Sequence, residues 1–407
     1  MPRLLQINIT SNWGSTGRIA EMIGNRVLAE GWSSEIAYGY LENPSNSETL
    51  RLSSKRKTRW HRRLAKYLGL DGLASNRATR RLIEEIETTK PDIIHLHNIH
   101  GFYLNYKILF EYLATIDTPV VWTLHDCWSF TGHCAHYFEC GCDRWMTECH
   151  HCPNKATYPK TYVDCTTRNH RLKRKLFTSL GDRLTITPVS QWLEQEASKS
   201  FFKESRIKYI YNGIDTTVFA PSTHSDIRQK YSIGDRPLCV SVASVWDAQK
   251  GLNEIIALRK QLPEEYALMI VGIAEHQLSL LPDGVIAIPR TQSQKELVDI
   301  YSTANVVLSL SRQETFGMTI AEGMACGTPA IVYRTTALPE LVTPETGRVV
   351  EQIGDIEGLT MAIMEVCQRP KESYVDKCRN RALEFFDKKR CTDNYFALYN
   401  ELLTKTK

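Results

Sequence analysis

Two series of short apolar runs, separated by helical stretches, constrain the fold of this 407-residue chain most strongly. Such alternation predicts parallel strands joined by crossover helices, which form doubly wound α/β sheets. The first series comprises Leu4–Ile9, Ser34–Tyr38, Asp92–Leu96, Val120–Leu124, Leu184–Pro188 and Ile207–Ile210. The second comprises Leu238–Ala243, Ala267–Val271, Val285–Ile288, Val306–Leu310 and Ala330–Tyr333. A chain of this length has room for two such domains, each with its own core.

A polar, turn-rich segment between the two series marks the expected domain boundary. It reads YNGIDTTVFAPS, residues 211–222. We therefore expect a first domain over 1–211, a second over 212–385 and a final helix over 386–407. Ligands of open parallel sheets bind at the carboxyl ends of the strands. We therefore expect the carboxyl ends of the strands in both sheets to face one shared cleft.

The composition is that of a soluble globular protein, with 42% hydrophobic and 24% charged residues. No run of about 18 apolar residues is present, so no membrane-spanning helix is expected. The amino-terminal MPRLLQINIT has a short apolar run without a cleavage pattern and predicts a first strand, not a signal peptide. We expect a cytoplasmic protein with reduced thiols.

The formal charge of +4 conceals a strongly basic segment. Residues 51–81 hold eleven Lys and Arg against Asp71 alone, which leaves −6 for the rest of the chain. Within 51–68, Trp60, Leu64, Tyr67 and Leu68 fall on one helical face, which suits an anionic membrane surface at the inner face of the membrane. The alternative is a solvated helix whose apolar stripe packs on its own domain. A nucleic-acid partner is not expected, because stacked aromatics and a known binding motif are lacking.

The string SRQETFGMTIAEGMACGTP, residues 311–329, carries the strongest functional signal. Helix is expected over Ala321–Cys326, with Gly317 at its start, where free backbone N–H groups and the dipole favour an anion. Glu314 precedes the helix and Glu322 lies about one turn inside it. Two carboxylates around an anion site suit a phosphorylated sugar. A strand–helix–strand unit with two solvated glutamates is the alternative.

This string resembles the signature of the GT-B glycosyltransferases of family GT4, which are retaining enzymes that use nucleotide sugars. The resemblance implies two Rossmann-like domains facing a cleft, with the last helix crossing back to the first domain. It implies that Glu314 contacts the transferred sugar and that Glu322 holds the ribose hydroxyls. The amides around Phe316, Gly317 and Met318 would then touch sugar and phosphate.

The first strand leads into SNWGSTGRIAEMIG, residues 11–24, with Gly14 and Gly17 ahead of a helix. Such a loop lets the backbone approach a phosphate closely. It is not a G-x-G-x-x-G sequence, and many strand–helix turns need glycine for structural reasons alone. It also resembles the GT4 glycine loop, which lies beneath the donor diphosphate and borders the acceptor.

Lys250, in SVWDAQKGLNEII, stands just before a helix of the second domain. A full positive charge beside a helix start suits a leaving diphosphate, although a surface lysine is common there. Members of the family usually carry an arginine a few positions earlier, where this chain reads Ser244–Asp247. The resemblance therefore leaves Arg290 or Arg18 as the second cation.

TLHDCW, residues 123–128, ends a predicted strand with His125 and Asp126. By its position, the resemblance implies that His125 contacts the transferred sugar. The neighbouring carboxylate of Asp126 could accept the proton of the acceptor hydroxyl, although nothing in the sequence requires it. The preceding strand ends with His95, His97 and His100. These could form an acceptor wall, or they could hold loops in place.

Six of the twelve cysteines lie between Cys127 and Cys152, in an expected loop over 127–153. Cys134, Cys142, Cys149 and Cys152 form a C-x7-C-x6-C-x2-C array that fits a closed structural zinc site. The side chains that could replace one of these ligands are Cys140, His133, His150 and His151. Disulfides are disfavoured by the expected compartment, and catalytic zinc is not expected because all ligand positions would be filled.

We therefore expect a retaining, metal-independent hexosyltransferase that moves sugar from a UDP- or GDP-sugar to a glycan or a polyprenyl-diphosphate-linked glycan. The setting would be the synthesis of a surface polysaccharide such as a capsule, exopolysaccharide or O-antigen. The absence of any Asp-x-Asp sequence agrees with catalysis without a metal cofactor. Two alternatives are a nucleotide-sugar epimerase of the UDP-GlcNAc 2-epimerase type and a non-enzymatic zinc-loop adaptor for membrane or nucleic acid.

Overall fold

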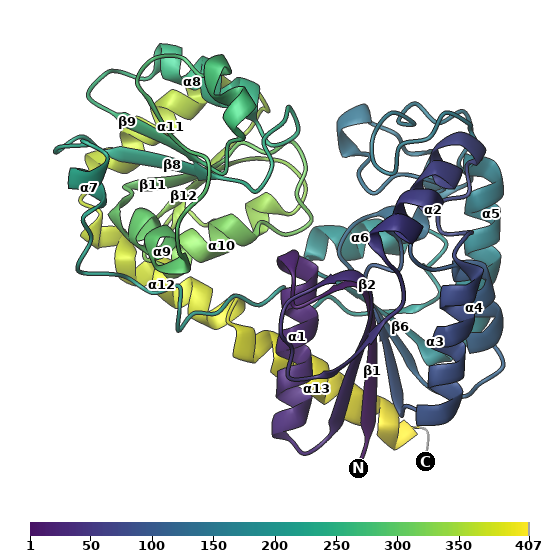
Figure 1. The fold of residues 1–407 in the computed structure, drawn as a ribbon. Helices are drawn as coiled ribbons and strands as arrows, with labels where there is room; N and C mark the ends of the chain where they lie inside the picture. The colour runs from purple at the N-terminus through teal and green to yellow at the C-terminus, as the bar shows by residue number, and fades with distance from the viewer. Residues whose placement is uncertain (406–407) are drawn as a thin grey trace. The chain divides into compact units, whose positions relative to one another are not determined.

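The computed structural model describes residues 1–405. The chain forms two compact units. Unit 1 comprises Met1–Tyr211 together with the final segment from Cys391, and unit 2 comprises Asn212–Arg390. Each unit is a parallel sheet with helices on both faces (Figure 1).

The sheet of unit 1 has seven strands in the order β3-β2-β1-β4-β5-β6-β7. Every neighbouring pair is parallel. The direction in which strands are added reverses between β1 and β4, and such a switch point is where open α/β sheets bind ligands. The strands are β1 (Arg3–Ser11), β2 (Ser33–Glu42), β3 (Glu48–Arg51), β4 (Ile93–Leu96), β5 (Val120–Leu124), β6 (Leu184–Pro188) and β7 (Arg206–Ile207).

Helices cover both faces of this sheet, and the last helix of the chain is one of them. Tyr395 and Tyr399 of α13 lie in one buried cluster with Leu4, Ile23 and Val121. The opposite face carries an aromatic cluster around Trp122. The helices are α1 (Gly14–Ala29), α2 (Lys55–Leu68), α3 (Asn76–Thr89), α4 (Tyr106–Leu113), α5 (Thr166–Phe177), α6 (Gln191–Lys199) and α13 (Lys388–Lys405).

The sheet of unit 2 has six parallel strands in the order β10-β9-β8-β11-β12-β13, with its switch point between β8 and β11. The strands are β8 (Leu238–Val242), β9 (Ala267–Val271), β10 (Val285–Ile288), β11 (Val306–Ser309), β12 (Ala330–Tyr333) and β13 (Gly347–Val350). The helices are α7 (Ile227–Lys230), α8 (Leu252–Gln261), α9 (Gln294–Thr303), α10 (Met318–Ala325), α11 (Ile356–Gln368) and α12 (Glu372–Phe385).

The predicted pair of doubly wound parallel sheets is confirmed, because strands covered on both faces read as continuous apolar runs. The edge strands β3 and β13 were missed, since both are short and interrupted by charged residues. Strand β7 ends at Ile207 instead of Ile210. Helix α10 begins at Met318, three residues before the predicted start at Ala321.

The basic helix within 51–68 forms as α2 from Lys55 onward, and much of its apolar stripe remains exposed. Trp60 is 61% exposed and Tyr67 is 56% exposed, while His61 and Ala65 face the core instead. The ring of Tyr162, from the cysteine-rich region, lies 5.4 Å from that of Tyr67 and enlarges this apolar surface. Within residues 1–405, no helix is both long and apolar enough to span a membrane.

Candidate functional site

Lys250 and Glu314 meet at the switch point of the sheet in unit 2. Lys250 lies in the loop after β8, and Glu314 follows β11. The Lys250 ammonium pairs with the Glu314 carboxylate at 2.5 Å, and Ser311 Oγ donates to the same oxygen at 2.9 Å. The lysine side chain is 37% exposed and that of the glutamate 22%, so the pair remains within reach of a ligand.

Backbone contacts explain why two residues 64 positions apart come together. Gly251 has φ of +83°, and a Cβ there would lie 2.4 Å from the carbonyl oxygen of Leu310, so only glycine lets this loop lie against the end of β11. The amide of Arg312 donates to the carbonyl of Gln249 at 2.8 Å. Thr336 Oγ1 accepts from the Glu314 amide at 2.9 Å and donates to the Glu314 carbonyl at 2.7 Å.

The second half of the glutamate string forms the start of α10. Gly317, at φ of +114°, precedes the first helical residue Met318, and a Cβ there would crowd Leu338 at 2.9 Å. The ring of Phe316 is buried, so its contribution to the site is its backbone. Glycine at the helix start leaves the first amides without a covering side chain, which suits an anion.

Glu322 lies one turn inside α10, half-buried, and accepts a hydrogen bond from the Tyr301 hydroxyl at 3.3 Å. Burial, and secondarily the nearby Glu322, raise the pKa of Tyr301 well above its ordinary value. The tyrosine therefore stays protonated and orients the carboxylate as a donor. Nothing in the sequence pattern indicated this partner.

The two arginines suggested in place of the family arginine, Arg290 and Arg18, lie on different elements, and neither follows β8 or β11. Arg290 is exposed and follows the edge strand β10, two strands from β8. Arg18 is exposed on α1 of unit 1. Arg312, within the glutamate string itself, pairs with the buried Glu254 of α8 at 2.6 Å. Lys250 is thus the cation that the structure places against Glu314.

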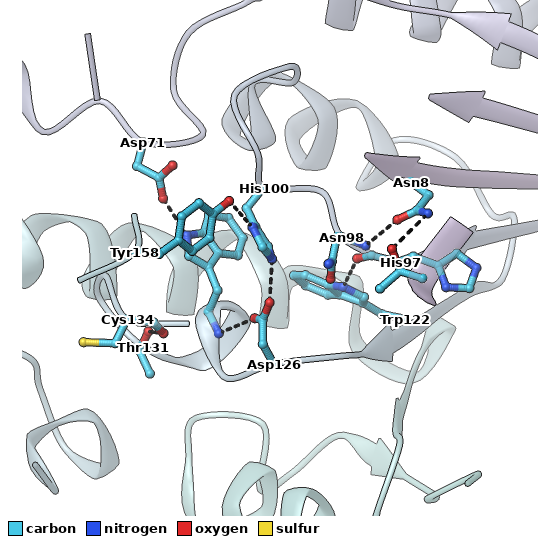
Figure 2. A network of polar contacts seen from close by, with 12 residues as sticks. Asn8, Asp71, His97, Asn98, His100, Trp122, Asp126, Thr131, Cys134 and Tyr158 are labelled. Carbon is cyan, nitrogen blue, oxygen red and sulfur yellow. Dashed lines mark hydrogen bonds and ion pairs between the residues drawn. The ribbon is translucent and has the colours of Figure 1, made fainter. Parts of the chain in front are cut away.

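In unit 1 Asn8, which was not among the predicted site residues, links the glycine loop to the loop after β4. Its amide nitrogen donates to the Thr10 carbonyl at 2.9 Å, and its oxygen accepts from the Asn98 amide at 3.3 Å (Figure 2). Gly14 begins α1, and Gly17 lies in its first turn. Polar Gln6 and Asn8 inside the otherwise apolar run of β1 were the available signal.

His125 ends β5 and belongs to a chain of hydrogen bonds that determines its tautomer. Gln6 Nε2 donates to the Ala20 carbonyl at 2.8 Å, so Gln6 Oε1 accepts from His97 Nε2 at 3.1 Å. His97 Nδ1 must then accept from His125 Nε2, also at 3.1 Å. His125 therefore carries its proton on Nε2 and leaves Nδ1 as an acceptor.

Both histidines are held neutral. Burial lowers the pKa of His125 to about 4; the charge of Asp126 acts to raise this pKa and that of His100 to lower it further. Burial also lowers the pKa of His97 well below its ordinary value. This tautomer directs the Nε2 proton of His125 to His97.

Asp126 has both oxygens engaged by the protein. One accepts from the Trp128 amide at 2.9 Å, and the other pairs with His100 Nε2 at 2.8 Å (Figure 2). Burial acts to raise the pKa of Asp126, but the charge and hydrogen bond of His100 outweigh it and bring the pKa to about 2. Such a carboxylate is a weak base, and its visible task is to hold His100, whose Nδ1 bonds the Tyr158 hydroxyl at 3.0 Å.

The His95 side chain holds secondary-structure elements together. It is fully buried, with Nε2 against Thr123 Oγ1 at 2.8 Å and Nδ1 against the hydroxyl of Tyr399 at 2.6 Å. It therefore joins β4 to β5 and to α13 instead of lining an acceptor wall.

The four cysteines of the expected zinc site line one small cavity of about 10 Å³. Cys134 Sγ and Cys152 Sγ are 3.9 Å apart, close to the about 3.8 Å between two thiolates on a tetrahedral zinc at ~2.3 Å. The Cys149 sulfur accepts from the Gly132 amide at 3.2 Å. Across residues 1–405, however, no three His, Cys, Asp or Glu side chains are grouped closely enough to hold a metal ion. The structure thus brings together one pair of the four.

Comparison with known proteins identifies the family. Residues 27–218 match the family described as "Glycosyltransferase Family 4". Residues 224–384 match the family described as "Glycosyl transferases group 1". A protein of Escherichia coli (strain K12), provisionally designated the colanic acid biosynthesis glycosyl transferase WcaC, is 24% identical over 98% of this chain and 100% of its own.

Solved structures share the fold along the whole chain. Sucrose-phosphate synthase from Thermosynechococcus elongatus has a TM-score of 0.73 at 17% identity and covers 100% of both chains. HepE of Anabaena, solved with UDP-glucose, has a TM-score of 0.64 at 14% identity and covers 99% of both. At these sequence identities the similarity to solved structures shows only that the fold is shared. Membership of the family is shown by the two family matches. The chain therefore belongs to the group 1 glycosyltransferases of family GT4 and is an enzyme with the GT-B fold.

Proposed function

We propose that this protein is a retaining, metal-independent glycosyltransferase that takes its sugar from a nucleoside diphosphate and adds it to a glycan or lipid-linked glycan of a surface polysaccharide. The observation that carries the proposal is the Lys250–Glu314 pair at the switch point of unit 2, beside the open start of α10. A cation and free amides suit the diphosphate, and the carboxylates suit sugar hydroxyls.

In this proposal the diphosphate displaces Glu314 from Lys250, because a phosphate oxygen competes for the same ammonium. The freed Glu314 carboxylate then accepts hydrogen bonds from the transferred sugar, and Glu322, oriented by Tyr301, holds the ribose. Charge that develops on the leaving diphosphate is stabilised by Lys250 and by the first amides of α10. His125, at the carboxyl end of β5, is proposed to contact the transferred sugar.

Two relatives support the choice of substrates. HepE was solved with UDP-glucose, which favours a uridine nucleotide sugar as the first donor to test. The full-length similarity to the protein designated WcaC favours a polysaccharide acceptor. We also propose a peripheral location at the inner surface of the membrane. It is supported by α2, where the exposed Trp60 and Tyr67 are set among Lys and Arg side chains and suit an anionic membrane surface.

Replacing Glu322 with alanine should weaken binding of the preferred nucleotide by roughly 1–3 kcal/mol, because the ribose hydroxyls lose a charged acceptor. The measurement is calorimetric titration with UDP, GDP and ADP after a thermal-shift screen. Glu345→Ala, an exposed glutamate of the same unit, should leave the affinity unchanged. Equal affinities for all three proteins would contradict the assignment. Incubation with nucleotide sugar alone should give at most slow hydrolysis, whereas a new sugar nucleotide would indicate an epimerase.

The cysteine-rich loop is proposed to bind one structural zinc through Cys134, Cys142, Cys149 and Cys152. Support comes from the Cys134–Cys152 separation and from the cavity that all four share. The contact with Cys134 also lowers the pKa of Cys152, which favours a thiolate there. Bound zinc would add a cross-link to a loop that also packs through the buried rings of Phe130, Tyr137 and Trp145.

Purified protein should therefore contain about one zinc per chain by elemental analysis, and Cys149→Ser with Cys152→Ser should contain none. Cys165→Ser removes a cysteine outside this cavity and should retain the metal. Metal-free wild-type protein of unchanged thermal stability would rule the site out.

A further inference from the structure

A residue with a strained backbone lies beside the glutamate string of unit 2. Thr336, in the loop after β12, has φ of +44°, in the left-handed region that side chains branched at Cβ rarely adopt. Within residues 1–405 six other non-glycine residues have a positive φ, and none of them is branched at Cβ. Such a conformation is costly and persists only where the surrounding structure enforces it, which happens most often at functional sites.

The residues on both sides of Thr336 anchor this loop. Before it, the buried Thr335 donates through Oγ1 to the carbonyl of Arg312 at 2.6 Å. After it, Ala337 and Leu338 are fully buried. Thr336 must therefore turn the chain between two fixed points, which explains how its left-handed conformation is maintained.

The hydroxyl of Thr336 contacts both peptide groups of Glu314. Oγ1 accepts from the Glu314 amide at 2.9 Å and donates to the Glu314 carbonyl at 2.7 Å. The amide of Ala337 donates to the same carbonyl at 3.2 Å. The backbone of Glu314 is thus held by the loop after β12, whereas its carboxylate is held by a different set of groups, Lys250 and Ser311.

This division of contacts suits a carboxylate that must move. In the proposed transfer the Glu314 side chain leaves Lys250 and turns to the sugar, and a fixed backbone lets it do so by rotation about its own bonds. A group that acts on a transition state must be held close to its productive geometry. Branching at Cβ restricts the rotamers of Thr336, so its hydroxyl stays directed at Glu314.

We propose that Thr336 is a positioning residue of the transfer site, whose left-handed backbone directs one hydroxyl to both peptide groups of Glu314 and so fixes the Cα about which the carboxylate turns. This role rests on the proposed function, because it assigns Thr336 to the same transfer. It predicts that the Thr336 hydroxyl supports turnover and contributes little to donor affinity.

Four variants separate the hydroxyl from the backbone strain. Thr336→Ser keeps the hydroxyl without the branch, Thr336→Val keeps the branch without the hydroxyl, and Thr336→Gly removes both. Thr335→Val is the matched control, because it deletes the neighbouring hydroxyl, which bonds Arg312 instead of Glu314. Thermal unfolding should rank Thr336→Gly above Thr336→Val, since glycine adopts a positive φ without strain.

Turnover is measured as release of UDP from UDP-glucose, and nucleotide affinity by calorimetric titration with UDP. Thr336→Val and Thr336→Gly should both lose roughly 10- to 100-fold in turnover, with UDP affinity within about threefold of wild type. Thr336→Ser and Thr335→Val should keep turnover within about threefold of wild type. Turnover that follows the unfolding temperature across the four variants would indicate a structural role alone and overturn the proposal, as would wild-type turnover in Thr336→Val.

Hydrogen exchange provides a measurement that does not depend on catalysis. Because the Glu314 amide donates to Thr336 Oγ1, its exchange should accelerate by roughly tenfold or more in Thr336→Val and Thr336→Gly. It should stay at the wild-type rate in Thr336→Ser and Thr335→Val, and unchanged exchange in Thr336→Val would overturn the inference. Failure of the proposed function gives a different result, since UDP would then not bind wild type, or Glu314→Ala would release UDP at the wild-type rate, whatever the Thr336 variants do.

Discussion

Lys250→Ala should lower the turnover of sugar transfer by roughly 10²–10³, because the departing diphosphate loses the cation placed at the switch point of unit 2. This corresponds to about 3–4 kcal/mol of lost transition-state stabilisation. The Michaelis constant for the donor should change much less, since the lysine is paired with Glu314 before the ligand arrives and binding must first break that pair.

Two further variants serve as a control and as a second test of the site. Lys260→Ala removes an exposed lysine of α8 and should leave turnover unchanged. Glu314→Ala should also reduce turnover more than donor affinity, because its carboxylate is assigned to the transferred sugar. Transfer at wild-type rates by either Lys250→Ala or Glu314→Ala would refute the assignment of the site.

Acidification below pH 6.5 should destabilise unit 1 through its buried histidines. Burial lowers the pKa of His125 to about 4 and the pKa values of His95 and His97 well below the ordinary 6.5. The unfolded chain takes up these protons below pH 6.5 while the folded chain does not, so stability is complete above pH 6.5 and falls as pH drops toward 4. His125 alone would remove about 3 kcal/mol over this range.

Urea unfolding from pH 8 to pH 4.5 measures this loss, with probes that report on unit 1. His97→Gln should flatten the dependence of the unfolding free energy on pH, even if it lowers stability at pH 8. His224→Gln, at an exposed position, should reproduce the wild-type slope. Burial raises the pKa of Glu35 in β2 to about 7, and its protonation stabilises the folded chain over the same pH range. Glu35→Gln removes this opposing contribution, and an unfolding free energy of that variant that stays constant between pH 7 and pH 5 would contradict the neutral state of the histidines.

The sequence predicted what depends on periodicity and local pattern. Buried parallel strands show as apolar runs, and the glutamate string could be assigned to a strand end and a helix start before any contact was known. It could not predict which side chains meet across the sheet. The Lys250–Glu314 pair depends on the close approach of Gly251 to Leu310, which is a tertiary contact without a local signal.

The histidine cluster shows the same limit. Four histidines near two strand ends suggested contacts with the sugar or the acceptor, but the partner of each decides its role. His95 is satisfied by Thr123 and Tyr399, and His100 by Asp126 and Tyr158, whereas His97 transmits the orientation of Gln6 to His125. The polar Gln6 within an apolar strand was the one available hint, since a buried amide needs partners.

The position of α13 affects how the molecule is made. Tyr395 and Tyr399 bond Thr123 and His95 in the interior of unit 1, although the whole of unit 2, Asn212–Arg390, is synthesised between these two pairs of residues. The half that leaves the ribosome first therefore lacks part of its interior until translation ends. The nascent amino-terminal half should therefore depend on chaperones. Truncation of the chain before Cys391 should destabilise unit 1 more than unit 2, although the deleted segment follows unit 2 in the sequence.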